Sequence, residues 1–308
     1  MADLAPMVVP SLSSLLSLVT DSLHSPHSQR AYRAALNEYL CWCQTAACTT
    51  FSKASVQAYR SMLEQRGLSA SSIRIRMSAV RRLAAEMADN NWLDPQTARA
   101  VAKVSGPRRN GVRLGNWLSV QQAEDLLALP QTDCLKGKRD RAILAVLMGA
   151  GLRREELCAL RFEHLQQREG RWLVADLVGK HERIRTVPVP GWCKAAIDVW
   201  TAAGQLSSGH VFRPLNKGGR VVGDRLTPQS VYRMVRDYAE RLGIRLAPHD
   251  LRRSFAKLAH KGRAALEQIQ LSLGHESIVT TELYLGVCQD LIDAPCDHLG
   301  IHPDHTLE

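Results

Sequence analysis

Residues 105–116 constrain the fold more than any other part of this 308-residue chain. The segment contains three glycines and a proline, which oppose regular secondary structure, and all of its charged residues are basic. A chain of this length can form two domains with separate cores. The sequence therefore predicts an N-terminal domain over residues 1–104, a linker over 105–116, a second domain over 117–290 and a C-terminal tail over 291–308.

The N-terminal domain is expected to be a bundle of helices. Apolar residues recur there with helical periodicity, and they predict three helices, over about residues 32–43, 56–63 and 73–87. Ser71 and Ser72 are candidate caps for the third of these helices. Pro95 favours the start of a fourth, short helix, because proline is common in the first helical turn.

The second domain is expected to combine helices with a small sheet. The pattern predicts two helices followed by two strands, over about residues 119–129, 138–149, 171–177 and 183–189. Gly179 and Lys180 belong to the expected turn between the strands. From Thr227 onward the pattern is helical again. The whole chain is therefore expected to be mainly α with a small antiparallel β-sheet.

Basic residues are clustered in the sequence, which has a net charge of +10 and a pI near 9.4. Arginines or lysines gather between residues 64 and 86, 103 and 113, and 245 and 263. Three such clusters favour contact with a nucleic-acid duplex over a single solvated basic face. The candidate DNA-binding residues are Arg74, Arg76, Arg81, Arg82, Arg108, Arg109 and Arg113.

Neither a disulfide framework nor a membrane anchor is expected. The eight cysteines are scattered along the chain and are interpreted as free thiols. Cys41, Cys43 and Cys48 lack the paired spacing of a zinc site. The apolar run around residues 10–19 has no basic segment before it, and no stretch is long and apolar enough to span a bilayer. A cytosolic protein without a membrane partner is the expectation.

Six residues, none of them adjacent in the chain, carry the groups that can break a phosphodiester without a metal ion. They are Arg153, Lys180, His249, Arg252, His275 and Tyr284. Arginine binds phosphate oxygens, a lysine can protonate a leaving oxygen, and an activated phenol can attack phosphorus. Taken singly, each of these residues is more easily interpreted without a catalytic role. A tyrosine in a helix usually packs against its neighbours, for example, and a lysine in a turn is usually exposed to solvent. Their order and spacing make the combination informative.

The residues around these six form recognisable motifs. The motifs are Gly151-Leu152-Arg153, Gly179-Lys180, His249-Asp250-Leu251-Arg252, Leu273-Gly274-His275 and Thr280-Thr281-Glu282-Leu283-Tyr284. Together they resemble the tyrosine recombinase, or phage integrase, family. The resemblance extends over residues 117–290, and the first hundred residues are similar only in helical architecture. One departure is His181, which stands where the family usually has a glycine after the lysine.

The resemblance implies a role for each residue. Arg153 and Arg252 would bind the scissile phosphate, Lys180 would be the general acid, and Tyr284 would be the nucleophile. His249 and His275 would contact the phosphate or accept the tyrosine proton. Glu156, three residues after Arg153, is expected to orient that arginine. No metal ion and no cofactor is required by this set of residues.

The implied protein is a site-specific recombinase or integrase with an N-terminal helical core-binding domain and a C-terminal mixed α+β catalytic domain. It would cleave double-stranded DNA at a specific target site through a 3′-phosphotyrosyl link. Four protomers would assemble on two duplexes, in the cytoplasm and associated with the nucleoid. Two alternatives remain, a type IB topoisomerase that relaxes DNA as a monomer and a catalytically silent DNA-binding protein.

Overall fold

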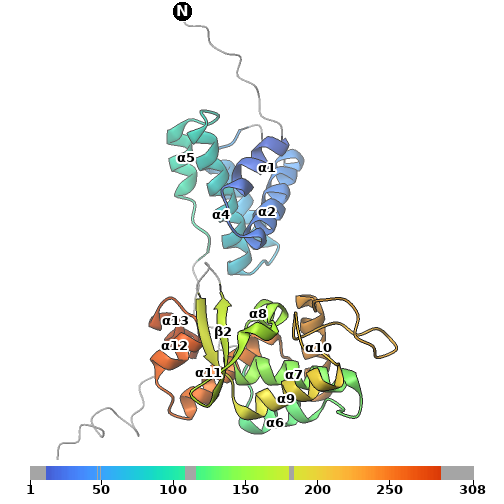
Figure 1. The fold of residues 1–308 in the computed structure, drawn as a ribbon. Helices are drawn as coiled ribbons and strands as arrows, with labels where there is room; N and C mark the ends of the chain where they lie inside the picture. Colours follow the sequence, from blue (N-terminus) through green and yellow to red (C-terminus); the bar gives the residue numbers. More distant parts are fainter. Residues whose placement is uncertain (1–11, 47, 49, 108–115, 180–183, 286–308) are drawn as a thin grey trace, which may run out of the picture. The chain divides into compact units, whose positions relative to one another are not determined.

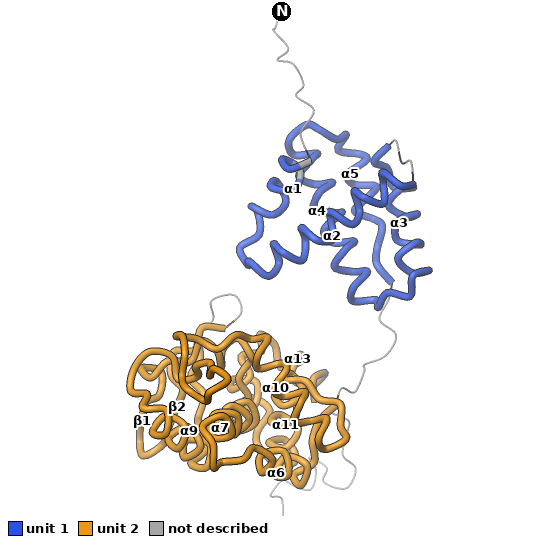
Figure 2. Tube along the Cα trace, turned by 90° about the vertical axis from the view of Figure 1, so that its right-hand side faces the viewer, with its two compact units in different colours: residues 1–111 blue, residues 112–308 orange. Residues whose placement is uncertain are grey.

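The computed structural model describes residues 12–46, 48, 50–107, 116–179 and 184–285. The chain divides into two compact units, residues 1–111 and 112–308 (Figure 2). This division falls inside the segment 105–116, where glycines and a proline oppose regular structure. The finer boundaries stay predictions, and the tail 291–308 lies outside the described residues.

The described part of the first unit is helical (Figure 1). Its helices are α1 (Leu12–Asp21), α2 (Pro26–Thr45), α3 (Lys53–Gln65), α4 (Ala70–Asp89) and α5 (Pro95–Ala102). The three helices expected from apolar periodicity are confirmed within α2, α3 and α4. Their apolar faces meet in one core, in which the largest buried side chains include Leu36, Tyr39, Tyr59 and Met77.

Two details of this unit differ from the sequence-based expectation. The cap of α4 is Ser69, whose hydroxyl accepts a hydrogen bond from the Ser72 N–H at 3.2 Å, so neither Ser71 nor Ser72 is the cap. The helix begins earlier because Ser69 keeps the extended backbone that a capping residue needs. Helix α1 was not predicted, and its buried Val19 belongs to the same core. The expected start of α5 at Pro95 is confirmed, with Asp94 as its cap.

Helices also dominate the second unit. They are α6 (Val120–Ala128), α7 (Leu135–Gly149), α8 (Arg154–Ala159), α9 (Gly191–Ala203), α10 (Pro228–Arg241), α11 (Pro248–Lys261), α12 (Leu266–Leu273) and α13 (Ile278–Leu285). Helix α7 is central: every residue from 142 to 150 is buried, and the helix packs against both α9 and α11. Ser119 caps α6 as expected. No helix in the ranges that the structure describes is long and apolar enough to cross a membrane.

A three-stranded antiparallel sheet lies beside these helices (Figure 1). Its strands are β1 (Leu165–Arg168), β2 (Arg171–Val178) and β3 (Ile184–Pro188), in the order β1-β2-β3. The β2 and β3 pair was expected from alternation, whereas β1 was not, because Leu165–Arg168 is too short and too polar to alternate. The mainly α fold with a small antiparallel sheet is confirmed. Helix α12 packs against β3.

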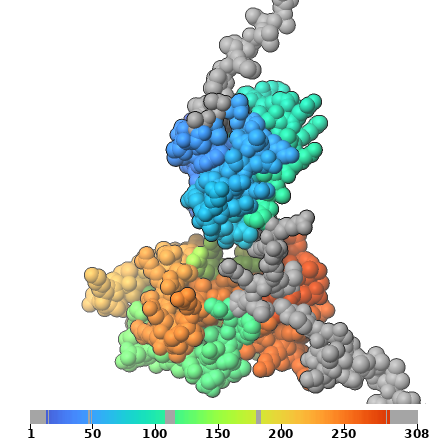
Figure 3. Space-filling model, turned by 180° about the vertical axis from the view of Figure 1, so that it is seen from behind, coloured from blue at the N-terminus to red at the C-terminus, as the bar shows by residue number. Residues whose placement is uncertain are grey.

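A separate small core joins the last three helices. Ala256 of α11, Ile269 and Leu273 of α12, and Leu285 of α13 are its buried members. In the view from behind, these C-terminal helices gather in red and dark orange on one side of the second unit, with α10 in lighter orange on the other (Figure 3). The core holds α12 and α13 against α11. Of the expected site residues, His249 and Arg252 lie on α11, His275 follows α12, and Tyr284 lies on α13.

Candidate active site

Arg153 is held by Glu156 at the start of α8. The backbone N–H of Arg153 donates to Glu156 Oε2 at 2.7 Å, and its Nη1 donates to Glu156 Oε1 at 2.7 Å. The first bond satisfies a helix N-terminal N–H, as in a capping box. The second orients the guanidinium. About a third of the Arg153 side chain remains exposed (32%), so the group is fixed at one edge and open at another.

The carboxylate of Glu156 is buried between two arginines. Arg185 of β3 binds it with both terminal nitrogens, Nη1 to Oε1 and Nη2 to Oε2, each at 2.8 Å. Burial alone would raise the pKa of Glu156, but the hydrogen bonds and charge of Arg185, and then those of Arg153, outweigh it and lower the pKa to about 2. Glu156 is therefore a permanent anion at neutral pH.

Replacing Glu156 with glutamine is expected to lower the free energy of unfolding of the second unit by about 3 kcal/mol at pH 7. The carboxyl has its ordinary pKa of 4.5 when unfolded and about 2 when folded. Its contribution is therefore complete above pH 4.5 and is lost as the pH falls from 4.5 to 2. Urea denaturation at several pH values measures the difference from wild type.

The exposed neighbour Glu155, replaced with glutamine, is the matched control and should leave unfolding nearly unchanged. If the difference in free energy of unfolding between wild type and Glu156→Gln were the same at pH 7 and at pH 3, the charge of the carboxylate would not be the cause of that difference.

Arg252 joins two segments that are far apart in the sequence. It lies in the second turn of α11, is only 1% exposed, and donates from Nη1 to the Gly151 carbonyl at 2.6 Å and from Nη2 to the Leu273 carbonyl. One bond reaches the turn before Arg153, and the other reaches the last residue of α12. Burial, and then the charge of Arg153, lowers the pKa of Arg252 to about 9, so the side chain stays protonated at neutral pH.

Two histidines lie near this arginine. His249 occupies the first turn of α11, and His275 follows α12 with its Nδ1 3.0 Å from the Thr281 hydroxyl. Partial burial and then the charge of Arg252 lower the pKa of His249, although the residue keeps an exposed side. The same two causes lower the pKa of His275 to about 4. Both imidazoles are therefore neutral at pH 7, with one donor and one acceptor nitrogen each.

Tyr284 of α13 lies against both histidines. Its ring centroid is 5.6 Å from that of His249 and 5.3 Å from that of His275, and both pairs meet edge to face. Its hydroxyl donates to the His249 carbonyl at 3.3 Å. Burial raises the pKa of Tyr284, while Arg252 and then Arg253 oppose the rise. The phenol is therefore protonated at neutral pH and has to lose its proton if its oxygen attacks.

The arginines that follow Arg153 and Arg252 have other contacts. Arg253 places its guanidinium carbon 5.0 Å from the centre of the Tyr284 ring, and Arg154 lies 5.9 Å from the Tyr232 ring. Arg253 therefore touches the expected nucleophile, a contact that the sequence did not indicate.

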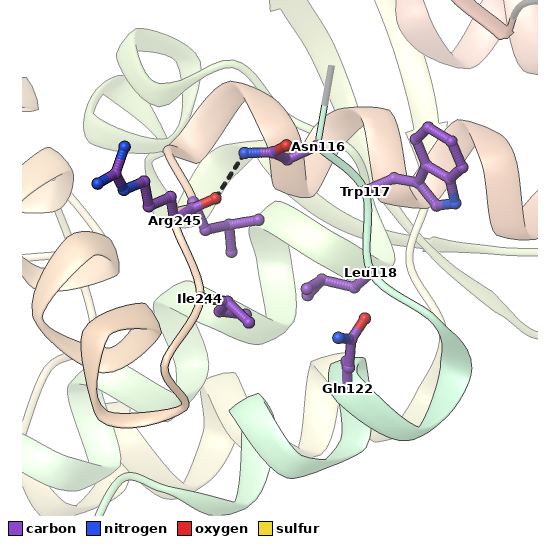
Figure 4. A pocket seen from close by; sticks show the side chains of 7 residues that line it. Asn116, Trp117, Leu118, Gln122, Ile244 and Arg245 are labelled. Carbon is purple, nitrogen blue, oxygen red and sulfur yellow. Dashed lines mark hydrogen bonds between the residues drawn. The ribbon is translucent and has the colours of Figure 1, made fainter. Parts of the chain in front are cut away.

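Lys180 lies outside the described residues. Its neighbour Gly179 lines a pocket of about 160 Å³ together with Arg185, Gly274 and His275. The end of β2 that leads to Lys180 is therefore close to His275. A larger hollow of about 430 Å³ is lined by Asn116, Trp117, Leu118, Gln122 and residues 244–246, and contains none of the six expected site residues (Figure 4).

The candidate DNA-binding arginines of α4 make internal contacts of different kinds. Arg74 donates to the Pro107 carbonyl at 3.2 Å and Arg82 pairs with Glu86 at 2.9 Å, and both residues are exposed. Arg81 donates to the Met77 carbonyl and the Ser78 hydroxyl. Arg76 pairs with Glu38 at 2.7 Å. Arg108, Arg109 and Arg113 lie outside the described residues. A role in DNA binding stays a prediction for all seven.

Sequence reasoning missed Arg185 and the hydroxyl of Thr281 as parts of the site. A signal for Arg185 existed, because residues two apart in a strand face the same side, and Arg185 is two residues before the buried Val187. An arginine on the inward face of a strand requires a buried partner. No sequence pattern named Glu156 as that partner.

Two family descriptions match the chain. The Phage integrase family matches residues 116–289, more than half of the chain, and the N-terminal SAM-like domain of phage integrases matches residues 15–90. Among similar proteins, tyrosine recombinase XerC of Pseudomonas fluorescens is 32% identical over 266 residues, which cover 84% of this chain and 85% of the relative. XerC of Xylella fastidiosa (strain M23) is 32% identical over 267 residues, with coverage of 84% and 86%.

Solved structures share the fold. XerH recombinase bound to its difH substrate, in a pre-cleavage complex, has a TM-score of 0.67 at 20% identity and covers 92% of this chain and 83% of its own. A lambda integrase(75-356) dimer bound to a COC' core site has a TM-score of 0.68 at 13% identity, with coverage of 89% and 93%. Given the family matches over both units and the identity to the XerC proteins, this chain belongs to the phage integrase family of tyrosine recombinases.

Proposed function

We propose that this protein is a site-specific DNA recombinase in which Tyr284 attacks a phosphodiester of double-stranded DNA. The observation that carries the proposal is the contact of Tyr284 with His249 and His275, which come from different segments of the chain, together with the charge of the buried Arg252 acting on the same phenol. Such a cluster of cations and neutral imidazoles around a phenol suits phosphoryl transfer. The names of the XerC relatives agree with this activity.

The proposed reaction is an exchange of one phosphoester for another. The Tyr284 oxygen forms a bond to the scissile phosphorus and loses its proton to one of the neutral histidines. The bond to the 5′ oxygen breaks, and Lys180 protonates that oxygen as it leaves. The products are a 3′-phosphotyrosyl link and a free 5′ hydroxyl. Attack by a 5′ hydroxyl from a partner duplex reverses the steps, so no external energy source is needed.

Arg153 and Arg252 are proposed to bind the non-bridging oxygens of the phosphate. Their planar guanidinium groups fit such oxygens, and both are already held in place, by Glu156 and by two main-chain carbonyls respectively. Donors that do not have to reorganise stabilise the charge that develops in the transition state, by about 3 kcal/mol each. Arg153, the more exposed of the two, is proposed to make the first contact with DNA.

The remaining parts of the proposal concern assembly and location. Four protomers are proposed to assemble on two duplexes, because exchange of strands requires two cleaved sites to face each other. The N-terminal unit is proposed to bind DNA through the exposed side of α4, where Arg74 and Arg82 lie. The protein is proposed to act in the cytoplasm, on DNA of the nucleoid.

Covalent capture tests the proposed activity. The protein is incubated with fragmented genomic DNA and denatured, and the DNA that stays attached is sequenced. We expect one short sequence to be enriched and joined through its 3′ end to Tyr284. Relaxation of any supercoiled plasmid, without an enriched sequence, would instead support a topoisomerase, and binding without attachment would support a catalytically silent protein.

Reversing the charge of Arg74, Arg81 and Arg82 to glutamate is expected to raise the dissociation constant for the target by several orders of magnitude. The logarithm of the binding constant falls linearly with the logarithm of the salt concentration, and each lost phosphate contact reduces the magnitude of that slope by about 1. For the triple variant we therefore expect a slope smaller in magnitude by about 3. Fluorescence anisotropy at several salt concentrations measures both quantities.

The control places the same change in net charge on Arg99, Arg168 and Arg171, which belong to none of the three basic clusters. It should lower affinity only modestly. An equal loss in both variants would mean that net charge, and not the surface of α4, governs binding.

A further inference from the structure

Arg185 is bonded to two separate parts of the site's framework, and none of the roles proposed above belongs to it. Its side chain is 9% exposed and all three of its nitrogens donate hydrogen bonds. Two go to Glu156 at 2.8 Å, and the third, from Nε, goes to the Ser272 carbonyl at 2.9 Å. A side chain so buried and so fully paired does not itself reach DNA. Its function has to be exerted through its neighbours.

These bonds connect three segments. Through Glu156, Arg185 is linked to the backbone and the guanidinium of Arg153. Through Ser272, it holds the last turn of α12, three residues before His275. Through its own strand, it is tied to β2, because Ile184 pairs with Val178 at the end of the hairpin that carries Lys180. Arg185 is the point where these three segments meet.

The backbone at Gly274, next to His275, lies close to the Arg185 side chain. The Gly274 backbone is left-handed, with φ of +61°, and a Cβ added there would lie 2.9 Å from Arg185 Cδ. A side chain at this position would push against the arginine stem as well as strain the turn. The turn that presents His275 is therefore shaped around Arg185.

Charge gives Arg185 a second effect on Arg153. The Glu156 carboxylate is buried, and without Arg185 it would have Arg153 as its single cationic partner among the described residues. A buried carboxylate with one partner binds that partner more strongly. It would then compete with a DNA phosphate for the Arg153 guanidinium. Arg185 supplies the carboxylate with further hydrogen bonds and a second positive charge. Part of the Arg153 guanidinium therefore stays available to bind a DNA phosphate.

We propose that Arg185 is a positioning residue for DNA strand cleavage, which sets the placement of both Arg153 and His275 without touching the substrate. This inference rests on the proposed function. Lysine at this position would keep the charge but could not bind both carboxylate oxygens and the Ser272 carbonyl at once, because it lacks the planar fork. Displacements of about 1 Å in such a site slow catalysis by roughly a hundredfold.

The test is single-turnover cleavage of a nicked target by Arg185→Lys, with the rate expressed per molecule competent to react. We expect this rate to fall by about tenfold to a hundredfold, while the dissociation constant for the target changes less than about threefold. The control is Arg213→Lys, since the Arg213 guanidinium likewise donates to the protein's own main chain, to the carbonyls of His210 and Ser208. It should cleave at the wild-type rate.

Two outcomes would overturn the inference. If Arg185→Lys lowers only the fraction of folded molecules, and those molecules cleave at the wild-type rate, Arg185 is merely structural. Arg185→Met combined with Glu156→Gln should cleave faster than Arg185→Met alone, because the unsatisfied carboxylate is gone; a rate no faster would show that Arg185 does not act through Glu156. If wild type forms no covalent complex, the proposed function fails instead.

Discussion

Replacing Tyr284 with phenylalanine is expected to abolish covalent attachment to DNA and to leave DNA binding nearly unchanged. The substitution removes only the attacking oxygen, while the ring keeps its contacts with His249 and His275. The hydrogen bond from the hydroxyl to the His249 carbonyl is long at 3.3 Å, so its loss costs at most about 1 kcal/mol. Denaturing gels detect attachment, and a mobility shift measures binding.

Tyr232→Phe is the matched control for this experiment. Tyr232 lies on α10, with Arg154 and Arg236 over its ring, and has no part in the proposed chemistry. It should keep full attachment. Persistent attachment in Tyr284→Phe would place the nucleophile elsewhere in the chain.

Replacing Arg252 with alanine is expected to slow cleavage by at least about a hundredfold, because one preorganised phosphate donor is lost. The same change deprives the Gly151 and Leu273 carbonyls of a donor, at about 1 to 3 kcal/mol for each buried group. The rate therefore has to be measured on the folded fraction. Arg252→Lys serves as a second variant, since it keeps the charge and fills most of the space.

Arg253→Ala is the control that separates the loss of a specific phosphate ligand from the loss of one positive charge near the site. Arg253 is adjacent in sequence, equally charged, and lies over the Tyr284 ring. We expect it to slow cleavage far less than Arg252→Ala does. The opposite result would contradict the assignment of Arg252 as the phosphate ligand.

Local sequence signals predicted much of the fold, and they failed where a local signal was weak. Ser119 and Pro95 start helices as expected, because capping and proline geometry act within one turn. Strand β1 is four residues of mostly polar sequence, too short for alternation to be visible. Helix α9 was also missed, since Trp192 and Val199 on its exposed side blur the contrast between its faces.

For the candidate site, the sequence by itself determined which chemical groups are available and in what order they occur. Motif residues are properties of the chain, so Arg153, Arg252, His275 and Tyr284 could be named without coordinates. Their roles stay proposals, and Lys180 lies outside the described residues. What the sequence could not provide was how these groups are held, because that depends on contacts between distant segments.

Only the tertiary structure decided those contacts. Glu156 and Arg185 are 29 positions apart, and Arg252 is 101 positions from Gly151, yet each pair is joined by direct hydrogen bonds. A buried ion pair forms where packing removes both groups from water and brings them into register, and neither condition is encoded by local periodicity or spacing. Sequence therefore names the groups that can react, and the packing of α8, α11, α12 and β3 determines which of them meet.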